Sequence, residues 1–299
     1  MALHLGAAVD LVRRRAVLGG TVALSLWSSK VFSGIPDPFA ISWPTNIPPL
    51  SDATGRTLAS ATINPSEKTF CALIEGQSLI GAHIPGSYTV QNPTRIININ
   101  WAGDRLAYQH KEPMLGPSFY PGAYISLCGK LGDLLIARGF DKVIWGNTSV
   151  AGASTAQLAP GGTLGHRIPV FFNVLRSLGI SGNQVSAIIS MEGERDAGNF
   201  VTGSVFKENR RQTRRAAQSF GFTGPMFIPV ETWTGVQPVV NPTIQQAQIE
   251  LAAEAGFAPG PNFDLLGLEY RDATLIHLNM LGHDTAAQMW ADTIAARFL

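Results

Sequence analysis

Charge and cysteine are both scarce in this chain of 299 residues. Only 14% of the residues are charged and the formal net charge is +1, so nothing favours a polyanionic partner such as nucleic acid. The two cysteines, Cys71 and Cys128, allow at most one internal disulfide bond. Because a buried free cysteine is common, the pair does not identify a redox compartment. The basic cluster 210–215 is expected to form a solvated helix face.

Metal-ligand patterns and repeats are missing as well. His83, His110 and His166 have no ligand-like spacing to another histidine, a cysteine or a carboxylate, so we expect no metal and no organic cofactor. There is no internal repeat and no low-complexity tract. The Gly-x-Ser-x-Gly elbow of α/β-hydrolases is also absent, because the glycine after Ser78 falls at Gly81, one position too late.

The N-terminal segment has the features of an export signal. Three arginines at 13–15 precede an apolar stretch at 19–27 that is too short to span a bilayer. This pattern is typical of a twin-arginine signal, so we expect 1–34 to be an export signal or an N-terminal anchor of an exported, periplasmic or secreted protein. A basic arm on a cytosolic protein is the alternative. Prolines predict an extended linker or surface wrap over 35–66, ahead of a folded domain over 67–299.

Strand-like and helix-like segments alternate along the folded domain. Strands are expected over 70–75, 95–101, 105–108, 142–146, 184–191, 226–230 and 263–268. Helices are expected over 123–138, 166–178, 204–220, 242–255 and 281–298. The helix at 242–255 has Asn241 as its N-cap and proline at its first position. This alternation predicts an α/β fold, a three-layer α/β/α sandwich with a parallel central sheet, in which 95–101 has one face covered.

The stretch 70–81 is the one around which the chain is organised. Its short apolar run ends at Glu75-Gly76, which predicts a buried strand followed by a turn holding Gln77 and Ser78. In open α/β sheets, ligands bind at the C-terminal ends of the strands. A serine at that edge can supply both a nucleophile and, through its backbone N–H, an oxyanion donor. The alternative is a strand-to-helix turn with a capping serine.

Later loops place further polar groups at the same edge. The loop after 142–146 contains Gly152, where a bare backbone N–H can approach a bound carbonyl. The strand 184–191 is followed by an unusually charged segment, 192–196. His277 lies just before the last helix. A serine, loops with donors and a late histidine form the set that acyl transfer requires.

The order and spacing of these motifs resemble the SGNH-type (GDSL-like) hydrolases. The likeness is greatest to their carbohydrate-acetylesterase branch, the sialate O-acetylesterase-like and acetylxylan esterase-like domains. Those domains begin with a strand ending in Gly-Gln-Ser-Asn, which resembles 76–78 with Leu79 in place of Asn. Their proline-containing run, glycine loop, Gln-Gly-Glu-Ser-Asp motif and final Asp-x-x-His-x-x-x-x-Gly resemble 96–116, 151–161, 192–196 and the segment with His277 and Gly282. The likeness covers about residues 68–299.

The resemblance implies a flavodoxin-like SGNH hydrolase fold and a role for each matched residue. Ser78 would be the nucleophile, and His277 its general base and later the acid that protonates the leaving sugar oxygen. The backbone N–H groups of Ser78 and Gly152 would donate to the oxyanion. The side chains expected to bind substrate are Gln77, Glu192 and Glu194.

Two departures from the family pattern concern the partners of these groups. Thr274 stands where the family has its aspartate, so Asp272 is the expected orienter of His277, with Glu269 or a backbone carbonyl as alternatives. Glu192 stands where the family has a side-chain amide donor. Because an ionised carboxylate only accepts hydrogen bonds, it would be protonated, turned toward its neighbour at 195, or used to bind a substrate hydroxyl.

The sequence therefore predicts an exported serine esterase that removes acyl groups, acetyl in particular, from a carbohydrate or polysaccharide. Its expected partner is the acylated carbohydrate, with no transmembrane domain beyond an N-terminal anchor. One alternative is a catalytically impaired glycan-binding accessory protein, favoured by Glu192 and by the missing Asp-x-x-His. Others are an SGNH esterase or lipase for a non-carbohydrate ester, and a structural surface protein held by its N-terminus.

Overall fold

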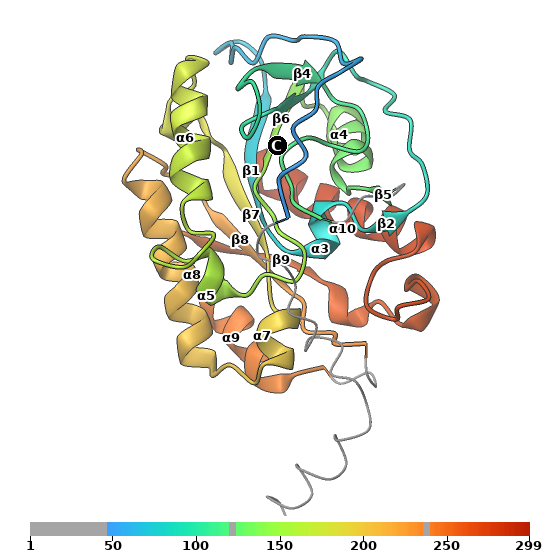
Figure 1. Cartoon of the computed structure of the whole chain (residues 1–299), viewed down its shortest axis with the longest axis vertical. Helices are drawn as coiled ribbons and strands as arrows, with labels where there is room; N and C mark the ends of the chain where they lie inside the picture. The colour runs from blue at the N-terminus through green and yellow to red at the C-terminus, as the bar shows by residue number, and fades with distance from the viewer. Residues whose placement is uncertain (1–46, 120–123, 236–239) are drawn as a thin grey trace, which may run out of the picture. The chain divides into compact units, whose positions relative to one another are not determined.

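The computed structural model describes residues 47–119, 124–235 and 240–299. A seven-stranded sheet has the order β4-β3-β6-β1-β7-β8-β9 (Figure 1). β3 and β4 pair antiparallel, and the other neighbours in the sheet pair parallel. The strands are β1 (Thr69–Gly76), β3 (Ile96–Ile99), β4 (Ala107–Gln109), β6 (Lys142–Asn147), β7 (Ala187–Met191), β8 (Met226–Val230) and β9 (Phe257–Asn262). The predicted α/β fold with a mostly parallel central sheet is confirmed.

Helices cover both faces of this sheet, as Figure 1 shows. On one face lie α6 (Arg167–Ser177), α8 (Gly203–Gln218) and α9 (Pro242–Ala252). On the other lie α4 (Cys128–Ala137) and α10 (Met280–Phe298). None of the helices in the described part of the chain combines the length and the apolar character that crossing a bilayer requires.

The central strand β1 divides the hydrophobic core into two layers. Phe70, Ala72 and Ile74 belong to the cluster under α4 and α10, whereas Cys71 and Leu73 belong to the cluster under the other helices. The alternation follows from the two-residue period of a strand, and because both faces are covered the strand reads as a continuous apolar run. Cys71 and Cys128 are both free, buried and in different clusters, so they do not pair.

Short elements occupy the segments between the main strands and helices. α3 (Ser78–Gly81), α5 (Thr155–Leu158) and α7 (Glu194–Gly198) follow β1, β6 and β7. β2 (Ile84–Pro85) pairs antiparallel with β5 (Tyr124–Ile125). Single 3-10 turns are η1 (Gly182–Gln184), η2 (Phe263–Leu265) and η3 (Leu268–Tyr270). The three short helices therefore begin at the C-terminal edge of the sheet, where the candidate site was expected.

Three predicted elements are corrected by the structure. The helix expected over 123–138 begins only at Cys128, because 124–125 form β5 instead. The last strand is β9, not 263–268, and it carries Pro259 and Pro261. Proline cannot donate to a strand ladder and is tolerated at a sheet edge, which is where β9 lies. β3 is buried on both faces rather than one.

Residues 57–59 run along the outer edge of β4. Leu58 bridges Tyr108 in antiparallel fashion, and the N–H of Ala59 donates to the carbonyl of Ala107 at 2.9 Å. Earlier in the chain, the N–H of Leu50 donates to the carbonyl of Pro117. This strip covers an edge that would otherwise present unpaired backbone groups. The expected signal or anchor at 1–34 lies outside the described residues.

Candidate active site

Ser78 lies at the tight turn between β1 and α3. The turn begins at Gly76, whose φ of 145° is in the region that favours glycine. A Cβ atom at Gly76 would lie 2.1 Å from the carbonyl oxygen of Met191, and the N–H of Gln77 donates to that same oxygen at 3.0 Å. Close backbone contact with β7 therefore fixes the turn and places Ser78 at the first position of α3.

His277 reaches Ser78 from the far end of the chain. Its Nε2 lies 3.0 Å from Ser78 Oγ, although 199 residues separate the two in sequence. Both side chains are almost buried, with 7% of Ser78 and 9% of His277 exposed. One face of the His277 ring stacks on His83, with ring centroids 3.8 Å apart and planes 15° from parallel. The expected serine–histidine pair is thus assembled in hydrogen-bonding geometry.

The loop that carries His277 is held by two side chains of its surroundings. The guanidinium of Arg271 donates to the carbonyls of Ile276 at 2.8 Å and Phe263 at 2.9 Å. The indole Nε1 of Trp233 donates to the carbonyl of Leu275 at 2.8 Å, and Arg271 lies over the Trp233 ring. These contacts fix the backbone on the N-terminal side of His277, so the imidazole is positioned before any substrate arrives.

Thr274, and not Asp272, lies against the second ring nitrogen of His277. Thr274 Oγ1 is 3.2 Å from His277 Nδ1. The carboxylate of Asp272 instead accepts hydrogen bonds from the hydroxyl and the backbone N–H of Thr274. The expected direct contact between Asp272 and His277 is therefore corrected, because the threonine hydroxyl lies between them. Glu269, the alternative orienter, is exposed at η3.

The imidazole of His277 is kept neutral. Burial, together with repulsion from a positive charge on the neighbouring His83 or Arg271, lowers its pKa to about 3. Burial also lowers the pKa of His83, against the attraction of Asp272. At neutral pH, His277 is therefore a free base that can accept a proton from the Ser78 hydroxyl.

The turn around Gly152 lies beside the end of β1. The N–H of Val150 donates to the carbonyl of Gly76 at 2.9 Å, and the neighbouring N–H groups of Ala151 and Ala153 donate to Ser118 and Val150. Gly152 has a φ of 66°, and within the described residues no group accepts a hydrogen bond from its N–H. Its place beside the nucleophile turn is consistent with the oxyanion donor that we predicted, and that role stays a prediction.

The three side chains expected to bind substrate are buried instead. Gln77, Glu192 and Glu194 are each 2% exposed or less. The Gln77 amide donates to the Glu194 carboxylate, directly behind the nucleophile. This placement does not favour direct contact of these side chains with a sugar hydroxyl, and the substrate-binding assignment stays a prediction.

Burial also changes the charge of these glutamates. It raises the pKa of Glu192 well above its usual range, with Arg210 as the opposing influence. It raises the pKa of Glu194 likewise, and the nearby carboxyl of Glu231 adds to the shift. Burial raises the pKa of Glu231 itself to about 8. The raised pKa favours the protonated form of Glu192, which can donate as well as accept a hydrogen bond.

A buried ion pair that the sequence analysis missed lies in the same region. Arg210, expected on a solvated face, is fully buried and donates to both oxygens of Glu75 at 2.7 Å. It also donates to the hydroxyl of Ser190 on β7. Glu75, near the end of an otherwise apolar strand, was the sequence signal for this pair, because a buried charge requires a partner of opposite charge.

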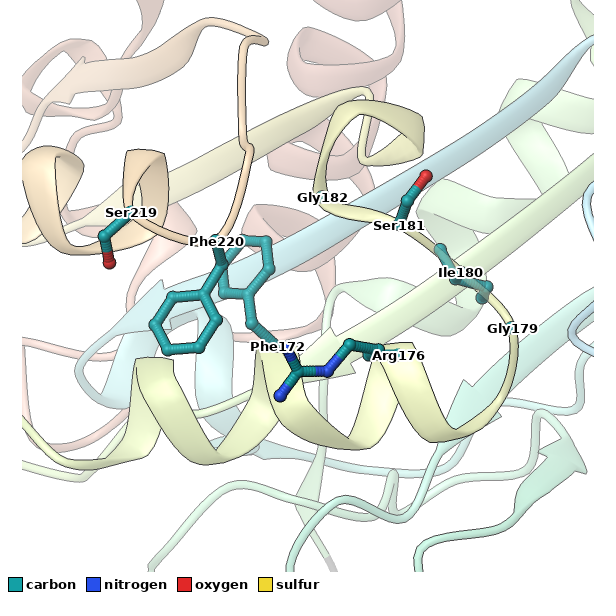
Figure 2. A pocket seen from close by; sticks show the side chains of 8 residues that line it. All are labelled: Phe172, Arg176, Gly179, Ile180, Ser181, Gly182, Ser219 and Phe220. Atoms are coloured by element: carbon teal, nitrogen blue, oxygen red, sulfur yellow. The ribbon is translucent and has the colours of Figure 1, made fainter.

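Two hollows lie away from Ser78. Figure 2 shows one of about 410 Å³ that is lined by Phe172, Arg176 and Phe220, where α6 ends and the chain turns toward β7. This hollow lies at the N-terminal ends of the strands, opposite to Ser78. Another, of about 450 Å³, is lined by the segments around Arg56 and Lys111. In the described ranges, no group of three histidine, cysteine or carboxylate side chains is arranged to hold a metal ion.

Comparison with known proteins gives structural matches only. No family model and no curated protein sequence matches the chain. A protein from Arabidopsis thaliana superposes with a TM-score of 0.61 at 12% identity, over 78% of this chain and 100% of that one. NanS superposes with a TM-score of 0.56 at 11% identity, over 79% of this chain and 98% of its own. The resemblance read from the motifs is confirmed for the fold: this chain has the fold of the SGNH hydrolases.

Proposed function

We propose that the protein is a serine esterase in which Ser78 is the nucleophile and His277 is the general base. The observation that carries the proposal is the 3.0 Å contact between Ser78 Oγ and His277 Nε2 at the C-terminal edge of a parallel sheet. A neutral imidazole and a buried hydroxyl in this geometry are the pair required for nucleophilic attack on a carbonyl.

The reaction follows from the arrangement of these groups. Ser78 Oγ attacks the ester carbonyl carbon while its proton moves to His277 Nε2, and the carbonyl oxygen becomes an oxyanion. The N–H groups of Ser78 and Gly152 donate to that oxyanion, and one such donor contributes about 3–4 kcal/mol to lowering the barrier. Collapse of the intermediate expels the alcohol, which takes the proton from His277. Water then attacks the acyl-serine with His277 again as the base.

We propose an O-acetylated carbohydrate or polysaccharide as the substrate. The motif order resembles the carbohydrate-acetylesterase branch, and NanS has the same fold. The near burial of Ser78 and His277 favours a small acyl group, because a long chain needs a wider opening beside the nucleophile. With the leader at 1–34, we propose that the enzyme works outside the cytoplasm.

A second candidate, an esterase for a more apolar ester, is favoured by exposed leucines in the sequence around His277. Leu268, Leu275 and Leu281 are 54%, 44% and 56% exposed, and all belong to the segment around His277. Exposed apolar side chains that gather on one segment are typical of contact with an apolar ligand. The acyl chain length that the enzyme prefers therefore separates the two candidates.

The experiment measures hydrolysis of p-nitrophenyl acetate, butyrate and octanoate, and release of acetate from an acetylated saccharide. We expect the acetyl compounds to be the best substrates and Ser78→Ala to abolish turnover of all of them. Ser204→Ala, at an exposed serine on α8, is the matched control and keeps full turnover. Turnover by Ser78→Ala equal to that of the control would exclude the proposed nucleophile, and preference for octanoate would favour the second candidate.

A further inference from the structure

The hydroxyl of Thr274 has well-defined neighbours on opposite sides. On one side it lies 3.2 Å from His277 Nδ1. On the other it donates to the carboxylate of Asp272, which also accepts the Thr274 backbone N–H at 2.8 Å. Since the single hydroxyl proton of Thr274 points to Asp272, only a lone pair of Oγ1 is left to face His277.

The loop geometry brings these groups together without a contact between Asp272 and the ring. The N–H of Asp272 donates to the carbonyl of His277 at 2.8 Å, and Arg271 bridges Leu278 in antiparallel fashion, so the loop closes on itself. Thr274 Oγ1 also accepts the backbone N–H of His277 at 3.2 Å. The threonine hydroxyl thus occupies the interior of the loop, where it separates the carboxylate from the imidazole.

We propose that Thr274 is the positioning residue of His277, and that Asp272 acts on the imidazole only through the Thr274 hydroxyl. This inference rests on the proposed esterase function. His277 Nδ1–H donates to Thr274 Oγ1, and Thr274 Oγ1–H donates to Asp272, so Nε2 is left free to take the proton of Ser78. No proton passes along the chain of hydrogen bonds: the Thr274 hydroxyl keeps its proton throughout the reaction.

Burial is the main cause of the lowered pKa of His277, and a hydroxyl at Nδ1 does little to offset it. A carboxylate in contact with Nδ1 would raise the pKa of the imidazole, whereas here its charge is one hydroxyl further away. The other groups around the ring are His83, stacked on its face, Arg271 and Ser78, and the positive charge of Arg271 disfavours protonation. The neutral form of His277 is therefore retained down to low pH. The imidazolium that forms when His277 takes the proton of Ser78 is stabilised by the dipole of the Thr274 hydroxyl.

The test compares Thr274→Val, which removes the hydroxyl at constant shape, with Thr274→Ser, which keeps it, and Thr274→Asp, which puts a carboxylate on Nδ1. We expect Thr274→Val to lower kcat for p-nitrophenyl acetate about 10- to 100-fold with KM unchanged, less than the about 10⁴-fold loss on removing a triad aspartate. Thr274→Ser should retain most of the activity. Thr274→Asp should raise the pKa of His277, so the acidic limb of the pH–rate profile moves to higher pH.

A double-mutant cycle distinguishes this positioning role from a purely structural role of Thr274. Asp272→Asn should lower kcat severalfold when residue 274 is threonine and leave it unchanged when residue 274 is valine, because the acid acts through the hydroxyl. Equal losses in both backgrounds would overturn the proposal, as would a Thr274→Val variant with the turnover and pH profile of the unaltered protein.

Titration of the His277 ring protons by NMR separates this proposal from the proposed function, because it needs no turnover. If no ester is hydrolysed but Thr274→Asp raises the His277 pKa and Thr274→Val shifts the Nδ1–H resonance, the positioning role stands and the esterase proposal falls. If the protein hydrolyses acetyl esters and neither variant changes the titration or the resonance, the positioning role falls and the esterase proposal stands.

Discussion

At the scale of single residues, stacking of His83 on His277 is the contact with the least obvious purpose. The rings lie 3.8 Å apart and nearly parallel, and both histidines have lowered pKa values because of burial. A neutral ring against one face of His277 limits its rotation and leaves its edge nitrogens free for Ser78 and Thr274. The stack therefore complements the loop contacts that hold the imidazole in place.

His83→Phe and His83→Ala distinguish the shape of this ring from its chemistry. Phenylalanine keeps the stack, so we expect turnover close to that of the unaltered protein. Alanine removes it, and turnover should fall about two- to tenfold, since an aromatic pair contributes about 0.5–1.5 kcal/mol. Steady-state kinetics on p-nitrophenyl acetate measure both variants. A large loss in the phenylalanine variant would mean that a His83 nitrogen takes part in the reaction.

At the scale of elements, the ion pair between β1 and α8 supports the strand that ends at the nucleophile. Arg210 and Glu75 are both fully enclosed, and the guanidinium also reaches Ser190 of β7 and the carbonyl of Thr155. One side chain of α8 thus ties three neighbouring segments together at the edge of the sheet. Because the pair is buried, removal of one partner leaves an uncompensated charge.

Arg210→Met tests that role by equilibrium unfolding in urea. We expect the free energy of unfolding to fall by about 3–5 kcal/mol, the usual cost of stranding one buried charge. Adding Glu75→Leu should restore most of the loss, because the stranded carboxylate is then removed. Arg215→Met is the matched control: Arg215 pairs with Glu208 at the surface of the same helix, where loss of an ion pair has little effect on stability. A loss no larger than that of the control would contradict the account.

At the scale of the whole molecule, the site depends on segments far apart in the sequence. Ser78 follows the first strand of the parallel sheet, and His277 precedes the last helix, so the pair forms only when β1 and α10 occupy their places in the layers. The parallel sheet brings the ends of β1, β6 and β7 to one edge, which gathers the turns at Ser78, Gly152 and Gly193 there.

Much of this arrangement could be predicted from the sequence because it rests on periodic or local signals. The apolar run before Gly76, the proline at the start of α9 and the order of the motifs lead to the sheet and to the pair Ser78–His277. β9 could not be predicted from the sequence pattern, because its two prolines are atypical of a strand. The roles of Thr274 and Arg210 could not be found either, because a six-residue loop sets the first contact and a partner 135 residues away sets the second.

The measurement that tests the central claim most directly is labelling of the full chain with a fluorophosphonate probe, followed by peptide mass spectrometry. Such a probe reacts with a serine hydroxyl only where a neighbouring base activates it. We predict one covalent adduct per chain, on the peptide that contains Ser78, and its absence from Ser78→Ala. An unlabelled chain, or an adduct that persists in Ser78→Ala, would contradict the assignment of Ser78 and His277 as a catalytic pair.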